Sequence, residues 1–96
     1  AASGNSSHAE GFGNSSYTKT IENTTYTGTG AHGNYAHSEG YTTWAIGPSS
    51  HAEGNETTAS GNSSHTEGNT TIASGEEAHA EGKNTKAAGN KSHAEG

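Results

Sequence analysis

Small and variable side chains alternate between the glycines of this chain, and the alternation predicts short β-strands. Between residues 33 and 96 glycine returns every seven residues, and Gly4 and Gly11 keep the same spacing. The third and fifth residues after each glycine are almost always Ser, Thr or Ala. Because side chains of a strand alternate between two faces, these small residues share one face. We expect them to point inward: Thr57, Ala59, Ser64, Thr66, Thr71, Ala73, Ala78, Ala80, Thr85, Ala87, Ser92 and Ala94.

The seven-residue units are of two alternating kinds, so the full repeat has fourteen residues. One kind carries His-x-Glu before its glycine, and the other carries varied residues such as Trp44, Thr58, Ile72 and Lys86 at the equivalent position. A short strand and a glycine turn of positive φ in each unit give two strands and two turns per repeat. That is one coil of a narrow β-solenoid. Coils stack about 4.8 Å apart, so we expect His to lie over His and Glu over Glu.

Helical folds fit the pattern poorly. Glycine in a helix interior costs about 1 kcal/mol relative to alanine, and it occurs here in every heptad. A coiled coil needs large apolar residues at two positions of each heptad, whereas this chain has no Leu, Val or Met. The sequence therefore predicts an all-β fold.

Composition adds that a single chain has little material for a core. Only 24% of the 96 residues are hydrophobic, which favours disorder for a compact globule. The strict glycine spacing, the single proline and the 15% of charged residues argue against a solvated tail. A roll filled with Ala, Ser and Thr is thin, so we expect one outer face to pack against another chain.

The charge pattern excludes several partners. The formal net charge is −6, and protonation of all seven histidines would bring it to −6 + 7 = +1. No basic patch exists for nucleic-acid binding, and the absence of cysteine excludes a disulfide framework. No apolar run has the length of a signal peptide or membrane span, so we expect no direct membrane contact. The chain begins within a repeat, and we interpret residues 1–96 as a single β-roll segment of a longer protein.

Three stretches, "WAIGPSSHAEG", "TASGNSSHTEG" and "IASGEEAHAEG", carry a family resemblance. They resemble the head repeats of YadA-like trimeric autotransporter adhesins, over residues 33–96 and 1–11. The resemblance implies a left-handed parallel β-roll, three chains around a three-fold axis, and a bacterial cell-surface location. It also implies binding to a matrix protein or to a cell-surface receptor or glycan. The same fold occurs in bacteriophage fibres, so the alternative is a shaft or receptor-binding segment of a phage tail fibre on the virion.

Residues 12–32 interrupt the repeat, because Asn5, Asn14 and Asn23 lie nine residues apart rather than seven. We expect an irregular insertion here, made of widened turns or a local hairpin. A protruding contact patch is the second interpretation, since aromatic residues concentrate at binding surfaces. The candidate ligand contacts are the aromatic residues in and near this stretch: Phe12, Tyr17, Tyr26, Tyr35, Tyr41 and Trp44.

The His-x-Glu units do not have the pattern of a catalytic or metal site. Ser7 and His8 point to opposite faces of a strand, so they cannot form a nucleophile–base pair. His8 and Glu10 share a face about 7 Å apart, too far for a bond unless the side chains bend. There is no Cys, no Asp and no His-Glu-x-x-His motif. We predict no enzyme, no metal site and no cofactor, although a three-fold axis could gather histidines around an ion.

A structural role explains His-x-Glu better. The His-x-Glu positions keep the same residues from coil to coil, which indicates a packed face. The alternate face varies from coil to coil, which indicates a face open to solvent. Our hypothesis is that the histidines and glutamates line the trimer interface and form charge-assisted hydrogen bonds between chains. The competing assignment, which follows the resemblance, turns the Ala-Ile-Gly face to the axis and His-x-Glu to solvent. The predicted interface residues are His8, Glu10, His37, Glu39, His51, Glu53, His65, Glu67, His79, Glu81, His93 and Glu95.

Asn-x-Ser/Thr sequences match glycosylation acceptors, but the repeat itself places Asn near the turn glycine. We interpret them as turn residues: Asn5, Asn14, Asn23, Asn55, Asn62, Asn69, Asn84 and Asn90.

Overall fold

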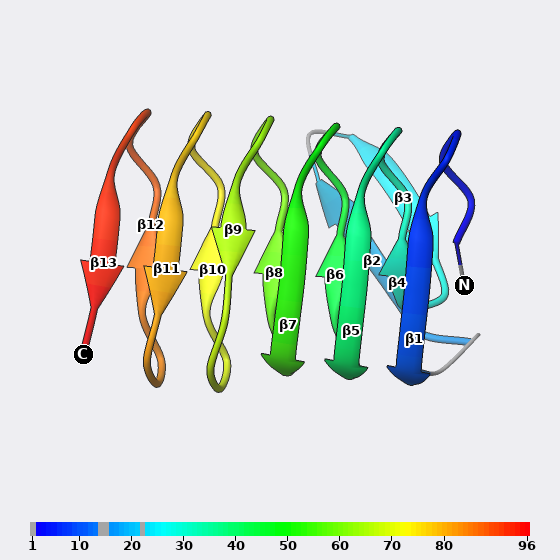
Figure 1. Cartoon of the computed structure of the whole chain (residues 1–96), viewed down its shortest axis with the longest axis horizontal. Helices are drawn as coiled ribbons and strands as arrows, with labels where there is room; N and C mark the ends of the chain where they lie inside the picture. Colours follow the sequence, from blue (N-terminus) through cyan, green and yellow to red (C-terminus); the bar gives the residue numbers. More distant parts are fainter. Residues whose placement is uncertain (1, 14–15, 22) are drawn as a thin grey trace.

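The chain winds into stacked coils, and each coil adds one strand to each of two parallel sheets (Figure 1). The structure is a computed structural model and describes residues 2–13, 16–21 and 23–96. Every regular element in these residues is a strand. The first sheet has the order β1 (His8–Phe12), β5 (His37–Tyr41), β7 (His51–Asn55), β9 (His65–Thr66), β11 (His79–Glu81) and β13 (His93–Glu95). The second has β12 (Lys86–Ala87), β10 (Ile72–Ala73), β8 (Thr58–Ala59), β6 (Trp44–Ala45) and β4 (Gly30–Ala31).

The register between neighbouring strands confirms the fourteen-residue coil. His51 pairs with His37 on one side and with His65 on the other, and Thr58 pairs in the same way with Trp44 and Ile72. The all-β, parallel solenoid predicted from the glycine spacing is therefore confirmed. Its left-handedness and its assembly as a trimer stay predictions. In the described residues, no helix has the length and apolar character needed to cross a membrane.

The interior of the roll holds the small residues that the alternation assigned to it. Thr57, Thr66 and Thr71 are fully buried, and the alanines of the inward positions from residue 52 to residue 87 are at most 2% exposed. Several inward hydroxyls hydrogen-bond to backbone carbonyls of their own turns, as Thr57 Oγ1 does to Glu53 O at 3.0 Å. In the last described coil Ser92 and Ala94 are half-buried.

The turn glycines from residue 33 to residue 82 all lie too close to the next coil to carry a side chain, but only those after His-x-Glu also have a positive φ. Gly54, which follows His-x-Glu, has a φ of 105° as expected for a turn glycine. Gly47 does not have a positive φ; the residue with positive φ in that turn is Ser49, at 57°. A Cβ on Gly47 would lie 2.0 Å from the carbonyl oxygen of Gly61 in the next coil. Glycine is needed there because successive coils approach too closely for any side chain.

An antiparallel hairpin, β2 (Thr18–Ile21) and β3 (Thr24–Thr27), lies outside the roll. It leaves after β1 and lies behind the second sheet near β4 and β6 (Figure 1). Its Lys19 Nζ lies 5.6 Å from the ring centre of Trp44. A hairpin was one of the two arrangements expected for this interruption.

The hairpin corrects the expectation that the variable face points to solvent. Trp44 is 4% exposed, Ile46 6% and Thr58 4%. The same face is open farther along, where Ile72 is half-buried and Lys86 is exposed. The variable residues therefore differ in solvent exposure, because the chain's own hairpin covers some of them and leaves others open.

Candidate functional site

The outer surface of the first sheet, which we call the His–Glu face, carries one histidine and one glutamate per coil. Its imidazole rings form a continuous stack from His8 to His93, with neighbouring ring centres 4.6–4.8 Å apart. The strand register produces this stack directly, because it sets equivalent residues side by side. The predicted ladders of His over His and Glu over Glu are thus present, and the side chains point away from the interior.

Glu10, Glu39, Glu53, Glu67 and Glu81 each reach the histidine of the next coil, a contact that alternation along one strand does not predict. Glu53 Oε1 accepts a hydrogen bond from His65 Nε2 at 3.0 Å. The equivalent pairs are His51–Glu39 at 3.2 Å, His79–Glu67 at 3.3 Å and His93–Glu81 at 3.0 Å. The 7 Å separation expected for His8 and Glu10 described strand positions, whereas the bent side chains bring His8 Nε2 to 3.7 Å from Glu10 Oε2.

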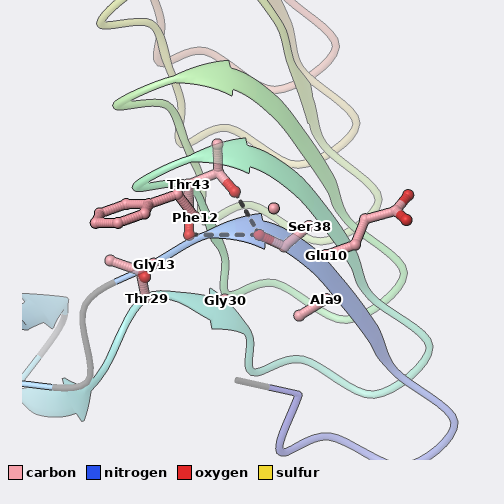
Figure 2. A pocket seen from close by; sticks show the side chains of 9 residues that line it. Ala9, Glu10, Phe12, Gly13, Thr29, Gly30, Ser38 and Thr43 are labelled. Atoms are coloured by element: carbon pink, nitrogen blue, oxygen red, sulfur yellow. Dashed lines mark hydrogen bonds between the residues drawn. The ribbon is translucent and has the colours of Figure 1, made fainter.

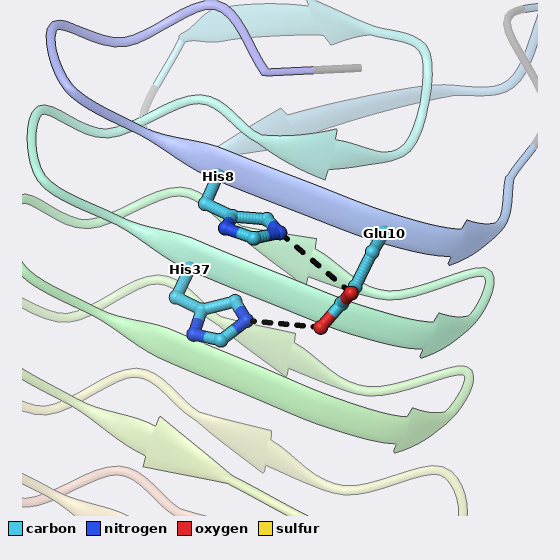
Figure 3. Close-up of side chains that lie close together, drawn as sticks. All are labelled: His8, Glu10 and His37. Atoms are coloured by element: carbon cyan, nitrogen blue, oxygen red, sulfur yellow. Dashed lines mark ion pairs between the residues drawn. The ribbon is translucent and has the colours of Figure 1, made fainter.

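The first two coils show how a carboxylate lies between two imidazoles (Figure 3). Glu10 lies 3.7 Å from the Nε2 of His8 in its own coil and 3.8 Å from the Nε2 of His37 in the next. The Nε2 of His37 is itself shielded from solvent and has no hydrogen-bond partner among the described residues. It lies 3.9 Å from Glu39 Oε1.

The face is partly shielded but remains accessible. The side chains of His37, His51, His65 and His79 are 34–38% exposed. The hydrogen bond from His51, helped by the nearby His37, lowers the pKa of the Glu39 carboxyl below its ordinary value, and partial burial opposes this only in part. Hydrogen bonding to a carboxylate favours its charged form, so Glu39 stays ionised at neutral pH.

Serine and histidine in the same unit serve separate purposes, as their positions on opposite strand faces predicted. Ser64 is 1% exposed, and its hydroxyl donates to Gly61 O at 2.7 Å. The neighbouring His65 points outward to Glu53. A nucleophile–base contact is therefore not formed by this pair.

A small pocket opens where the hairpin leaves the roll (Figure 2). Backbone and small side chains around Gly13, Thr29 and Gly30 line it, and the Ser38 hydroxyl is hydrogen-bonded to Thr43. The carboxylate of Glu10 points away from it, toward the His–Glu face (Figure 2). The pocket therefore brings together no set of ionisable groups.

The six candidate aromatic residues do not form one patch. Phe12 and Tyr41 stack at 4.8 Å with an interplanar angle of 6°, and they are 61% and 47% exposed. We call these two residues the aromatic pair. Tyr17 and Tyr35 are exposed away from it, at 48% and 67%.

Trp44 and Tyr26 differ from the expectation of an open ligand surface. The His32 ring lies 5.9 Å from the Trp44 ring and 5.4 Å from the Tyr26 ring, measured between centres. Trp44 is buried under the hairpin and Tyr26 is half-buried. In this arrangement Trp44 packs against the hairpin and lines a pocket together with Tyr17 and Lys19, and a ligand contact there stays a prediction.

Several of the Asn-x-Ser/Thr asparagines lie in turns, including Asn5, Asn62 and Asn90. Asn23 and Asn84 have positive φ values of 68° and 57°, a conformation that Asn tolerates better than most residues. Asn14 lies outside the described residues. The turn interpretation of these five is consistent with their backbone geometry.

Comparison of the chain with protein-family models, with curated proteins and with solved structures finds no match.

Proposed function

We propose that this chain is a non-enzymatic module of a homotrimeric surface structure, which holds an adhesive contact on a rigid β-solenoid. The observation that carries the proposal is the uniform register of both sheets, coil after coil. Hydrogen-bonded stacking of identical coils gives a stiff element that grows in length by repetition. This suits a spacer or a display surface, on a bacterial cell or alternatively on a phage tail.

The thin interior supports assembly with other copies. Its residues are Ala, Ser and Thr, so the apolar area removed from water per coil is small and a single chain gains little hydrophobic stabilisation. The hairpin covers the second sheet around Trp44 and Thr58, whereas the His–Glu face is uncovered along its whole length. We therefore propose that the three chains meet through the His–Glu face.

The aromatic pair supplies the proposed adhesive contact. Phe12 and Tyr41 present two parallel, exposed rings at one edge of the first sheet. Aromatic side chains contribute large contact area at protein interfaces and offer apolar faces to sugar rings. The proposed partners are a matrix protein or a cell-surface receptor or glycan for an adhesin, and a bacterial wall polysaccharide for a phage fibre.

A binding assay against both kinds of partner tests the proposal. The unmodified chain should bind one of two immobilised materials, matrix proteins or bacterial wall polysaccharide. The double variant Phe12→Ala/Tyr41→Ala should lose this binding. Tyr35→Ala is the matched control, because Tyr35 is 67% exposed but lies in the turn before β5, away from the aromatic pair. Binding to neither material, or equal loss in the control, would contradict the proposal.

A further inference from the structure

Repeated groups of two imidazoles and one carboxylate lie along the His–Glu face. In each of five groups, one nitrogen from each histidine and one carboxylate oxygen lie within 4.8 Å of one another. The groups are His8–Glu10–His37, His37–Glu39–His51, His51–Glu53–His65, His65–Glu67–His79 and His79–Glu81–His93. We infer that this face is a row of binding sites for divalent transition-metal ions of the zinc type.

The ligand atoms fit the chemistry of zinc. Two histidine nitrogens and a carboxylate oxygen, with the fourth position open to water, form a known zinc ligand set, with bonds of about 2.0–2.2 Å. In a tetrahedron with such bonds the ligand atoms are about 3.4 Å apart. His65 Nε2 and Glu53 Oε1 are 3.0 Å apart, and His51 Nε2 and Glu39 Oε1 are 3.2 Å apart. The same-coil distance from His37 to Glu39 is 3.9 Å, and atoms of one group lie up to 4.8 Å apart, so side chains must move by about 0.5–1.4 Å to bind one ion.

Charge and accessibility favour a cation at these groups. The ligands of the central groups are about one-third exposed, and His8, Glu10 and His93 at the two ends are 51–61% exposed, so an ion can enter at every group. Three of the four lysines are engaged or placed elsewhere: Lys91 pairs with Glu77 at 2.7 Å, Lys19 lies over Trp44, and Lys86 belongs to the second sheet. The fourth, Lys83, is exposed and follows the strand of Glu81. The shielded Nε2 of His37 has no hydrogen-bond partner among the described residues and lies 3.8 Å from Glu10 and 3.9 Å from Glu39, so an ion between them would bind it directly.

The overlap of the groups sets the number of ions. His37, His51, His65 and His79 each belong to two groups, and one Nε2 binds one ion. Only three groups share no histidine, namely the first, third and fifth. We therefore expect at most three ions per chain, in alternate gaps between coils. Neighbouring ions would be two coil spacings, about 9.6 Å, apart, close to the Debye length at physiological ionic strength.

Metal binding would also remove the charge that opposes contact between His–Glu faces. The face carries six carboxylates, −6 in total with neutral imidazoles, and three divalent ions bring 3 × 2 = +6. Binding should therefore promote the assembly described above. This consequence rests on the proposed function, but the sites themselves do not, because each is complete within one chain.

Calorimetric titration of the chain with zinc chloride, at neutral pH and without chelating buffer, tests the inference. We expect three zinc ions per chain, with affinity falling as the pH is lowered because imidazole must be deprotonated to bind. Magnesium and calcium should not bind these sites, since both prefer all-oxygen ligands. Equal binding of calcium, or no zinc binding, would overturn the inference.

Two variants and a matched control locate the ions. Glu53→Gln and His65→Gln each remove a member of the third group, and no choice of the remaining groups then exceeds two ions. Glu76→Gln makes the same charge change in a turn outside the five groups and should keep three. An equal decrease in the number of bound zinc ions in Glu76→Gln would overturn the assignment. Three bound ions in both Glu53→Gln and His65→Gln would also overturn it. Zinc binding by a monomer would separate this inference from the trimer, which is measured independently by solution mass.

Discussion

Replacing Thr66 with valine should stabilise the fold, although Thr66 is fully buried and lies in the middle of the solenoid. Its side chain stands in a column between Ala52 and Ala80 of the neighbouring coils. Its hydroxyl oxygen is shielded from solvent and has no hydrogen-bond partner among the described residues. Valine has nearly the same shape and replaces the unpaired hydroxyl with a methyl group.

The magnitude follows from the cost of a buried polar group without a partner, about 1–3 kcal/mol. Thr66→Val should raise the free energy of unfolding by a value in this range. Thr57→Val is the matched control, because Thr57 is also fully buried but donates to Glu53 O at 3.0 Å. Losing that bond should lower the free energy of unfolding by about 0.5–1.5 kcal/mol. The same chemical change should thus have opposite signs at two positions.

Urea unfolding followed by far-UV circular dichroism measures both variants, at one protein concentration because assembly contributes to stability. The difference between them should be about 1.5–4.5 kcal/mol. If Thr66→Val destabilises the chain as much as Thr57→Val, the interior is not the dry stack of small side chains described above.

Three further predictions concern the hairpin, the glycines and the carboxylates. Trp44→Ala should lower the free energy of unfolding by about 3–5 kcal/mol and expose Lys19 to early trypsin cleavage; unchanged proteolysis would contradict the packing of the hairpin. Gly61→Ala should disrupt folding, measured by circular dichroism, because its Cβ would lie 2.0 Å from Gly75 O. Gly89→Ala should be nearly neutral, because no atom lies nearer than 3.7 Å to its Cβ. Equal effects of the two variants would refute the close approach between coils. The pKa of Glu39 is lower in the folded state than its ordinary value. Its contribution to stability is therefore present above the ordinary glutamate pKa of about 4.3 and is lost as the pH falls through the lower folded value. Equal urea midpoints at pH 7 and pH 3 would contradict this.

Much of the fold could be predicted from the sequence because the repeat is local and strict. Period-two alternation fixes which residues point inward, and the glycine spacing fixes the coil. The close approach of coils at Gly47 and Gly61 could not be predicted in this way. It is a contact between two coils, and a glycine in the sequence does not show whether it is needed for a positive φ or for close packing. The position of the hairpin likewise depends on packing over Trp44, a contact between segments far apart in the sequence.

The His–Glu face was only partly predictable. Alternation placed every His-x-Glu outward and in register, but alternation along one strand does not show which side chains of neighbouring coils touch. A glutamate side chain spans the spacing of about 4.8 Å between coils, which is how Glu53 reaches His65. The spacing between coils is therefore the signal from which the imidazole–carboxylate groups could have been predicted. The packing of the His–Glu face against other chains depends on the surfaces of those chains, and it stays a prediction.

The most direct test of the account is the solution mass of the unmodified chain by light scattering, with folding verified by circular dichroism, in zinc and in a chelator. We expect a folded β species of three times 9.6 kDa, with a larger trimeric fraction in zinc. A folded chain that remains at 9.6 kDa in both conditions and at all concentrations would contradict the trimer.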